Sequence, residues 1–137
     1  MSRTDAERLQ EVFRREYRSL LQYAREASPY AAGPDRKLLD EVLRVAAEES
    51  DALAGFGDFL AGRHVPAPYL GSFPMAFTDL NFVGIRFLLP KLAAEQKQDL
   101  AKLETDAAAQ SDPAARTAVQ RLVDLHRRHL TELEALG

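Results

Sequence analysis

The chain has 137 residues, 46% of them hydrophobic, and this length fits one domain that spans residues 1–137. The lack of cysteine excludes disulfides, thiol catalysis and cysteine-held metal clusters, and a formal net charge of −3 argues against nucleic acid as a partner. No stretch approaches the roughly 20 apolar residues that a membrane span needs, and the N-terminus is polar, so we expect a cytoplasmic protein with no membrane contact.

The first predicted helix covers about residues 4–27. Thr4 and Glu7 match a capping box, in which the two side chains satisfy free backbone donors at a helix start. From Leu9 onward, apolar residues recur every three or four positions, as on one face of a helix. Proline disfavours helical geometry in the residue before it, so Pro29 ends the helix, and the short turn that follows predicts an antiparallel neighbour.

The second predicted helix covers about residues 35–61, with Gly62 as its C-terminal cap. The segment 62–74 contains three prolines and cannot continue a helix, so we expect a long crossover there. Because this crossover also carries apolar residues, it is expected to pack along the other helices. His64 is expected to face solvent.

The third predicted helix covers about residues 75–110, and Pro90 is expected to kink it. The fourth covers about residues 113–136 and starts with Asp112 as its N-cap, followed by a proline at the first helical position. Four helices with a single long connection in the middle predict an all-α four-helix bundle. In this topology the second and third helices run parallel to each other.

Charged and imidazole side chains fall on the apolar stripes of all four predicted helices. Glu49 lies in the row of core positions of the second helix, and Glu16 and Glu95 lie at or beside the rows of the first and third. His126 and His129 lie one turn apart on the fourth. Ionised groups in a core are costly unless they are paired or bind a cation, so the pattern predicts a metal site inside the bundle.

Other residues compete for the same positions. Tyr17 competes with Glu16 for the inward direction, and Gln96 and Asp99 compete with Glu95. The alternative to a metal site is a set of ion pairs, because such networks often imitate functional clusters. The basic residues that could pair with these acids are Arg15, Arg18, Arg127 and Arg128.

These helices and acids resemble the ferritin-like superfamily, whose di-iron site takes a Glu from each of two helices and a Glu-x-x-His from each of the other two. The resemblance implies that Glu16, Glu49, Glu95 and His129 occupy ligand positions. It also implies that Tyr23, seven residues after Glu16, lies beside the site. Iron, manganese and zinc suit such oxygen and imidazole ligands.

The chain departs from the family pattern at two positions. Ala52 stands three residues after Glu49, where the family has His, and His126 stands three residues before His129, where the family has Glu. The resemblance therefore implies a single-metal or vestigial site of unassigned activity, with the metal ligands drawn from Glu16, Glu49, Glu95, His126 and His129.

A second hypothesis is a non-catalytic module that forms a homodimer, or binds a protein partner, through the crossover and the first half of the third helix. Aromatic residues are frequent there, and aromatics at helical spacing are expected in the core. If several of them were exposed, they would mark a contact surface. The aromatics in question are Tyr69, Phe73, Phe77, Phe82 and Phe87.

Overall fold

A computed structural model describes residues 1–137 and is all-helical, with 74% helix and no strands. The all-α prediction is therefore confirmed. Its elements are α1 (Arg3–Tyr17), α2 (Leu20–Tyr23), α3 (Asp35–Gly62), the 3-10 helix η1 (Met75–Leu80), α4 (Ile85–Ala109) and α5 (Pro113–Leu136). None of the helices combines the length and the hydropathy that crossing a bilayer requires.

The predicted first helix, 4–27, forms as two helices. The N-cap of α1 is Ser2, whose Oγ accepts a hydrogen bond from the backbone N–H of Asp5 at 3.0 Å, so the capping box expected at Thr4 is wrong. α1 ends at Tyr17, and Ser19 caps α2 by accepting a hydrogen bond from the N–H of Gln22 at 3.2 Å. A serine that bonds the backbone in this way favours a new helix start over a helix interior.

The predicted third helix starts later than expected. Residues 75–80 form η1, and α4 begins only at Ile85. Between them Phe82 has a φ of 62°, a left-handed conformation that no helix contains. The backbone of Tyr30 accepts from Ile85 N and donates to Val83 O, each at 2.8 Å, and so holds this segment outside the helix. Beyond it, α4 continues through Pro90.

The other two helices follow their predicted bounds closely. α3 runs to Gly62, but the left-handed residue after it is His64, with a φ of 58°, so Gly62 is not the cap. His64 is exposed, as expected. Asp112 caps α5 by accepting a hydrogen bond from the N–H of Ala115 at 2.9 Å, which confirms the predicted helix start.

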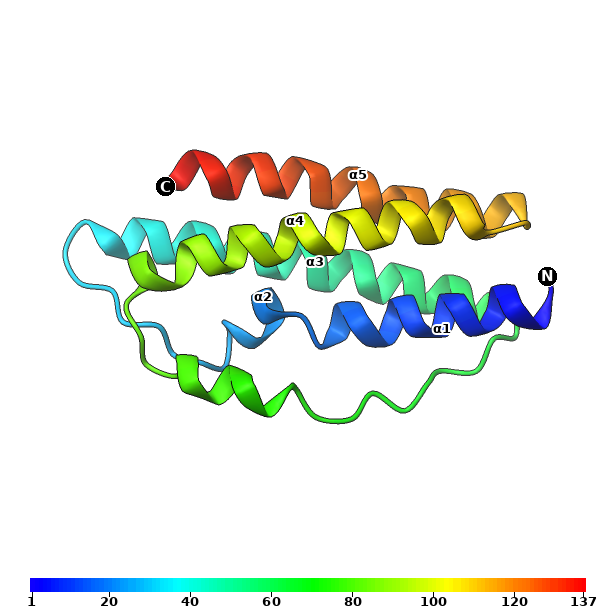
Figure 1. The fold of residues 1–137 in the computed structure, drawn as a ribbon, viewed down its shortest axis with the longest axis horizontal. Coiled ribbons are helices and arrows are strands. Elements are labelled where there is room, and N and C mark those ends of the chain that lie inside the picture. The colour runs from blue at the N-terminus through cyan, green and yellow to red at the C-terminus, as the bar shows by residue number, and fades with distance from the viewer.

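Figure 1 shows how the helices run. α1 and α3 are antiparallel, α4 and α5 are antiparallel, and α3 and α4 point the same way. The segment 63–84, which includes η1, returns along the length of the molecule beside α1 and α2. α5 packs against α4 and α3, while α1 packs against α3 and α4. The end of α1 and the middle parts of α3, α4 and α5 therefore meet in the interior.

The apolar core is divided into two clusters. The first cluster includes Leu9, Leu53, Leu103 and Val119. The second includes Leu20, Val42, Ile85, Leu92 and Leu133. On α3, α4 and α5, buried polar residues separate the residues of one cluster from those of the other, and Glu16 near the end of α1 separates the α1 residues of the first cluster from the α2 residues of the second. The middle of the molecule is thus a polar layer between two apolar ones.

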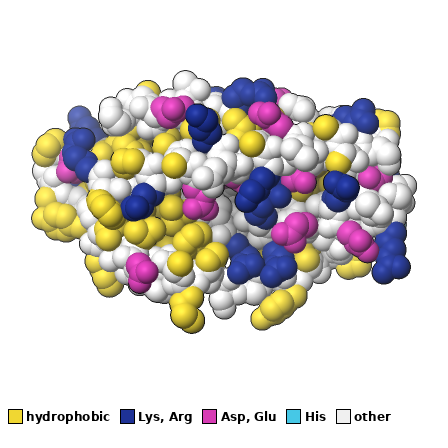
Figure 2. All heavy atoms as spheres, viewed as in Figure 1, with side chains coloured by type: hydrophobic (Ala, Val, Ile, Leu, Met, Phe, Trp, Pro, Cys, Tyr) yellow, Lys and Arg dark blue, Asp and Glu magenta, His cyan; other side chains and the backbone are white.

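Several aromatics that were expected in the core are exposed. Tyr69 is 88% exposed, Phe82 is 73% exposed and Phe87 is 57% exposed, whereas Phe73 and Phe77 are half-buried. The core prediction is therefore wrong for the first three. Tyr69 and Phe82 lie on the crossover and the turn before α4, which no helix covers, and Phe87 lies at an exposed position within α4. Figure 2 shows hydrophobic side chains gathered on the part of this face near the start of α4.

Candidate metal centre

The polar layer is built from one position on each of three helices and two positions on α5. Glu16 of α1, Glu49 of α3, Gln96 of α4, and His126 and His129 of α5 are each at most 6% exposed. They are buried because each lies on the inward stripe of its helix, between leucines and valines of the two apolar clusters. Polar groups buried this deeply need partners among themselves or a bound ion.

His126 lies at the centre of this layer. Its Nε2 is 3.3 Å from Glu16 Oε1 and 3.5 Å from Glu49 Oε1. Its Nδ1 is 3.4 Å from Asp99 Oδ2, and the Asp99 side chain comes from α4. One imidazole therefore touches carboxylates from three different helices.

Glu16, Asp99 and His126 form a group that could hold a metal ion. One ligand atom from each lies within 4.8 Å of the others. Two atoms that each lie about 2.2 Å from one ion are at most about 4.4 Å apart, so small side-chain rotations are enough to close the group around a cation. Glu16 Oε1 and Asp99 Oδ2 are also buried without any hydrogen-bond partner. These orphaned oxygens fit a cation.

Arg15 supplies the positive charge that balances part of the cluster. Its Nε is 3.1 Å from both Glu16 Oε2 and Asp99 Oδ1. Its Nη2 is 2.9 Å from Asp106 Oδ2, close enough for an ion pair but without hydrogen-bond alignment. One guanidinium is thus shared by three carboxylates.

The pKa of Glu16 reflects its burial and its acidic neighbour. Burial raises the pKa of Glu16 well above its ordinary value. A hydrogen bond that protonated Glu16 can donate to Asp99, and the charge of Asp99, raise this pKa further, while Arg15 offsets only part of the increase. An acid that is held close to a second carboxylate in a dry site gives up its proton readily only when a cation replaces it.

His129 holds Glu49 in place. Its Nδ1 lies 2.7 Å from Glu49 Oε2, and its Nε2 lies 3.0 Å from Glu48 Oε2. Both ring nitrogens therefore face carboxylate oxygens, an arrangement that favours the charged ring, in which both nitrogens donate. Burial alone would lower the pKa of His129, but the hydrogen bonds to Glu49 and Glu48 outweigh it and raise this pKa above 6.5.

Gln96 completes the network around Glu49. Its Nε2 donates to Glu49 Oε2 at 2.6 Å and lies 3.1 Å from His126 Nδ1. Because Gln96 and His129 both bind Oε2, the other oxygen of Glu49 is left to face His126. The structure thus brings together four of the five predicted metal ligands, namely Glu16, Glu49, His126 and His129.

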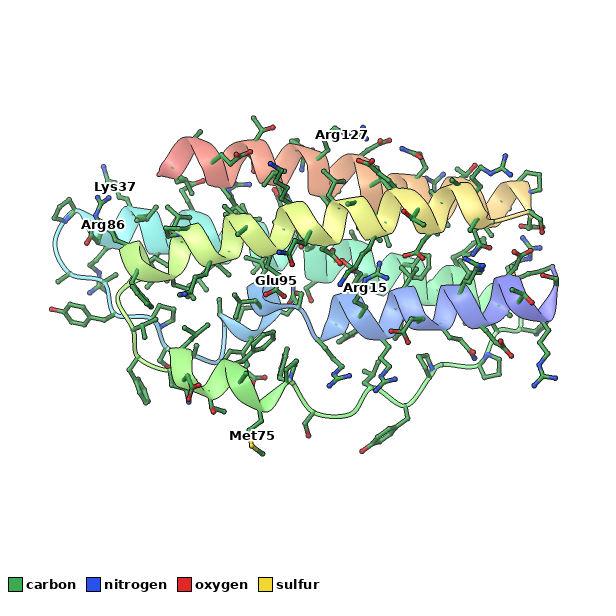
Figure 3. All side chains as sticks on the ribbon, viewed as in Figure 1. Arg15, Lys37, Met75, Arg86, Glu95 and Arg127 are labelled. Atoms are coloured by element: carbon green, nitrogen blue, oxygen red, sulfur yellow. The ribbon has the colours of Figure 1, made fainter.

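The fifth predicted ligand, Glu95, lies outside this group. Its Oε1 accepts a hydrogen bond from the N–H of Leu20 at 3.2 Å, at the start of α2 (Figure 3). Tyr23, expected beside the site, donates its hydroxyl to Asn81 and packs against Phe73 of the crossover. Both side chains tie the α1–α2 region to its neighbours.

The sequence did not decide whether Glu95, Gln96 or Asp99 faces inward on α4. In the structure Gln96 and Asp99 do so. The signal was the spacing of Leu92, Gln96 and Leu103 along one stripe, which continues after Pro90 without a change of phase. The ion-pair alternative holds only in part, because among the four arginines considered only Arg15 contacts Glu16 or Asp99. Arg18 donates to the carbonyl of Ser72, Arg127 to Glu104 and Arg128 to Glu48.

A comparison of the chain with protein-family models, curated proteins and solved structures finds no match. The function of the polar layer is therefore argued from its geometry and chemistry. Two buried carboxylate oxygens without partners, next to an imidazole, form a set of hard and intermediate ligands of the kind that divalent transition metals prefer.

Proposed function

We propose that this protein binds one divalent metal ion in its polar layer, with Glu16, Asp99 and His126 as ligands. The observation that carries the proposal is the pair of buried oxygens, Glu16 Oε1 and Asp99 Oδ2, which have no hydrogen-bond partner and lie against His126. Glu49, whose Oε1 is 3.5 Å from His126 Nε2, is the nearest further ligand.

The ligand chemistry favours manganese, iron or zinc. Two or three carboxylates with one imidazole suit these ions, whereas magnesium and calcium prefer oxygen ligands alone. His129 and Gln96 serve as outer partners that fix the orientation of Glu49. Such outer contacts commonly change metal affinity about 10-fold to 100-fold when they are removed.

The test is a metal titration of protein prepared without chelator. We expect elemental analysis to find metal in the purified protein, and we expect added Mn²⁺ to raise its stability against urea. At a free metal concentration of 100 times the Kd, the gain is about 2.7 kcal/mol. Glu16→Gln and Asp99→Asn remove one charged ligand each, so both variants should lose this gain.

Glu95→Gln is the matched control. Glu95 is an acid of the same region, but its Oε1 binds the N–H of Leu20, and a Gln side chain keeps that acceptor. We therefore expect Glu95→Gln to bind Mn²⁺ as well as the wild-type protein does. Equal loss in Glu95→Gln and Glu16→Gln, or no stabilisation of the wild type by any of the three metals, would contradict the proposal.

We also propose a ferritin-like topology with a reduced metal centre. It is supported by two antiparallel helix pairs joined by a long crossover, and by buried acids near the end of α1 and at mid-length of α3. The Nε2 atom of His126 faces the carboxylates without forming a hydrogen bond to any of them. The ring nitrogens of His129 are already hydrogen-bonded to Glu49 and Glu48, so His126 is the one imidazole left for a metal ion. The metal content should therefore be one ion per chain, and a content of two would contradict a reduced centre.

The second candidate function is an interaction module that forms a homodimer. The observation in its favour is the exposure of large apolar side chains on the crossover and at the start of α4, where Tyr69, Met75 and Phe82 are 88%, 85% and 73% exposed. Exposed apolar groups that gather on one face mark contact surfaces.

Light scattering over a dilution series tests the dimer. A homodimer should dissociate on dilution, and a Met75→Ser/Phe82→Ser double variant should remain monomeric at concentrations where the wild type pairs. Glu16→Gln leaves this surface unchanged, so it serves as a control and should dimerise normally. A wild-type protein that is monomeric throughout would contradict this candidate.

A further inference from the structure

A surface cavity of about 330 Å³ lies between α1 and α4, next to the polar layer. Its walls include Arg15, Gln96 and Asp99, so it shares a wall with the candidate metal centre but extends beyond it. Pockets that bind small molecules begin at about 300 Å³, so this volume suits a small ligand.

The two ends of the cavity differ in chemistry. Because α1 and α4 run in opposite directions, Arg14 and Lys102 line one end, while Leu20 and Leu92 line the other (Figure 1). Phe77 of η1 adds a further apolar wall at the second end. Figure 2 shows the same division on this face, with hydrophobic side chains gathered toward the start of α4 and charged ones beyond them.

The basic end carries cations that are only weakly paired with acids of the protein, although Glu11 also lines it. Arg14 meets an acid only at 3.9 Å, from Glu11, and its Nε is buried without a hydrogen-bond partner. Lys102 forms no ion pair within 4.0 Å. Arg18, which also lines the cavity, donates its Nε to the carbonyl of Ser72 and likewise has no acidic partner. Cationic groups that line a cavity without a close acidic partner fit an anionic ligand.

We propose that this cavity binds an organic carboxylate with a short aliphatic chain. The carboxylate lies between Arg14 and Lys102, where the planar guanidinium matches its two oxygens. The aliphatic chain packs against Leu20, Leu92 and Phe77. This site goes beyond the proposed metal function and does not need a metal ion.

Glu95 stands between the two ends. It lines the cavity, and its Oε1 is already engaged by the N–H of Leu20. Burial raises the pKa of Glu95, with the N–H of Leu20 and Lys102 acting in the opposite direction. A carboxyl group that takes up a proton more readily opposes an incoming carboxylate less, so Glu95 is compatible with an anion at the basic end.

The test is an NMR titration of the full chain in EDTA, so that its outcome does not depend on the metal proposal. Hexanoate is the probe, and hexanol and inorganic phosphate each supply only one half of its chemistry. We expect hexanoate to shift the amide signals of Leu20 and Leu92 saturably, with a Kd at least about tenfold lower than those of the other two compounds. Hexanol lacks the hydrogen bonds to charged groups and phosphate lacks the buried aliphatic chain, and each of these is worth at least this factor.

Charge-matched variants locate the site. Arg14→Gln/Lys102→Gln removes the two cations from the cavity and should weaken hexanoate binding by about tenfold or more. Arg8→Gln/Lys97→Gln removes two exposed cations from the same two helices outside the cavity, and should bind normally. Equal weakening in both variants, or wild-type binding of hexanol or phosphate as tight as that of hexanoate, would overturn the proposal.

Discussion

The sharpest prediction concerns Arg15→Met, which removes the only guanidinium that contacts Glu16 and Asp99. The carboxylates of Glu16, Asp99 and Asp106 then face one another without the cation that they share. Removing one partner of a buried ion pair costs about 3–5 kcal/mol, and because the Arg15 side chain is 21% exposed and Glu16 can take up a proton, we expect about 2 kcal/mol.

The assay is thermal and urea unfolding at pH 7 in EDTA. For 137 residues the entropy of unfolding is about 0.29 kcal/mol/K, so a loss of about 2 kcal/mol lowers Tm by about 7 °C. The matched control is Arg14→Met, one position earlier on α1, where the side chain is 43% exposed and its nearest acid is 3.9 Å away. This control should change the stability by less than about 0.5 kcal/mol.

Two further results follow from the same reasoning. The cost of Arg15→Met should shrink in acid, because protonation of Glu16 removes the repulsion from Asp99. It should also shrink when Mn²⁺ is added, because a cation in the candidate centre replaces the lost charge. Equal stability of the Arg15→Met and Arg14→Met variants would refute the view that Arg15 balances the charge of the polar layer.

Three other predictions test the fold. Leu103→Ala, at a fully buried position in the core, should cost about 2–5 kcal/mol in urea unfolding, and a cost below about 1 kcal/mol would contradict close packing there. The hydrogen bonds from Arg63, and then from the N–H of Ala115, lower the pKa of Asp112 from 3.8 to about 2. The contribution of ionised Asp112 to the free energy of unfolding should therefore be complete above pH 3.8 and lost as the pH falls to about 2. The Asp112→Ala variant should lack this loss when its stability is measured by acid unfolding. Pro90 is exposed within α4 and has no N–H, so Pro90→Ala should raise the free energy of unfolding by about 1–3 kcal/mol, and a urea midpoint that does not rise would show that the helix already compensates for the proline.

The helices α3 and α5 could be predicted closely because local signals and apolar spacing agree there. Asp112 before a proline marks the start of α5 by a hydrogen bond within one turn. The breaks at Ser19 and Phe82 were not predicted, since both depend on competition between local and distant contacts. Ser19 bonds the backbone of the next turn, and the segment around Phe82 is held by Tyr30, more than fifty residues away in the chain.

Periodicity by itself showed that acids and imidazoles occupy inward positions, because the direction of a helical side chain follows from its place in the repeat of 3.6 residues. That was enough to anticipate buried Glu16, Glu49, His126 and His129. Which of them meet was decided only by the tertiary structure. The relative rotation and axial shift of packed helices arise from the fit of whole faces.

The choice between Glu95 and Asp99 shows what helical periodicity does not predict. Both lie near the inward stripe of α4, and only the positions of α1, α2 and α5 around that helix assign Glu95 to the N–H of Leu20 and Asp99 to His126 and Arg15. The sequence therefore determined that Glu16, Glu49, His126 and His129 face the interior, but not which acid of α4 joins them. The packing of separate helices determined which atoms of those side chains lie within a few ångströms of one another, because no local repeat encodes that distance.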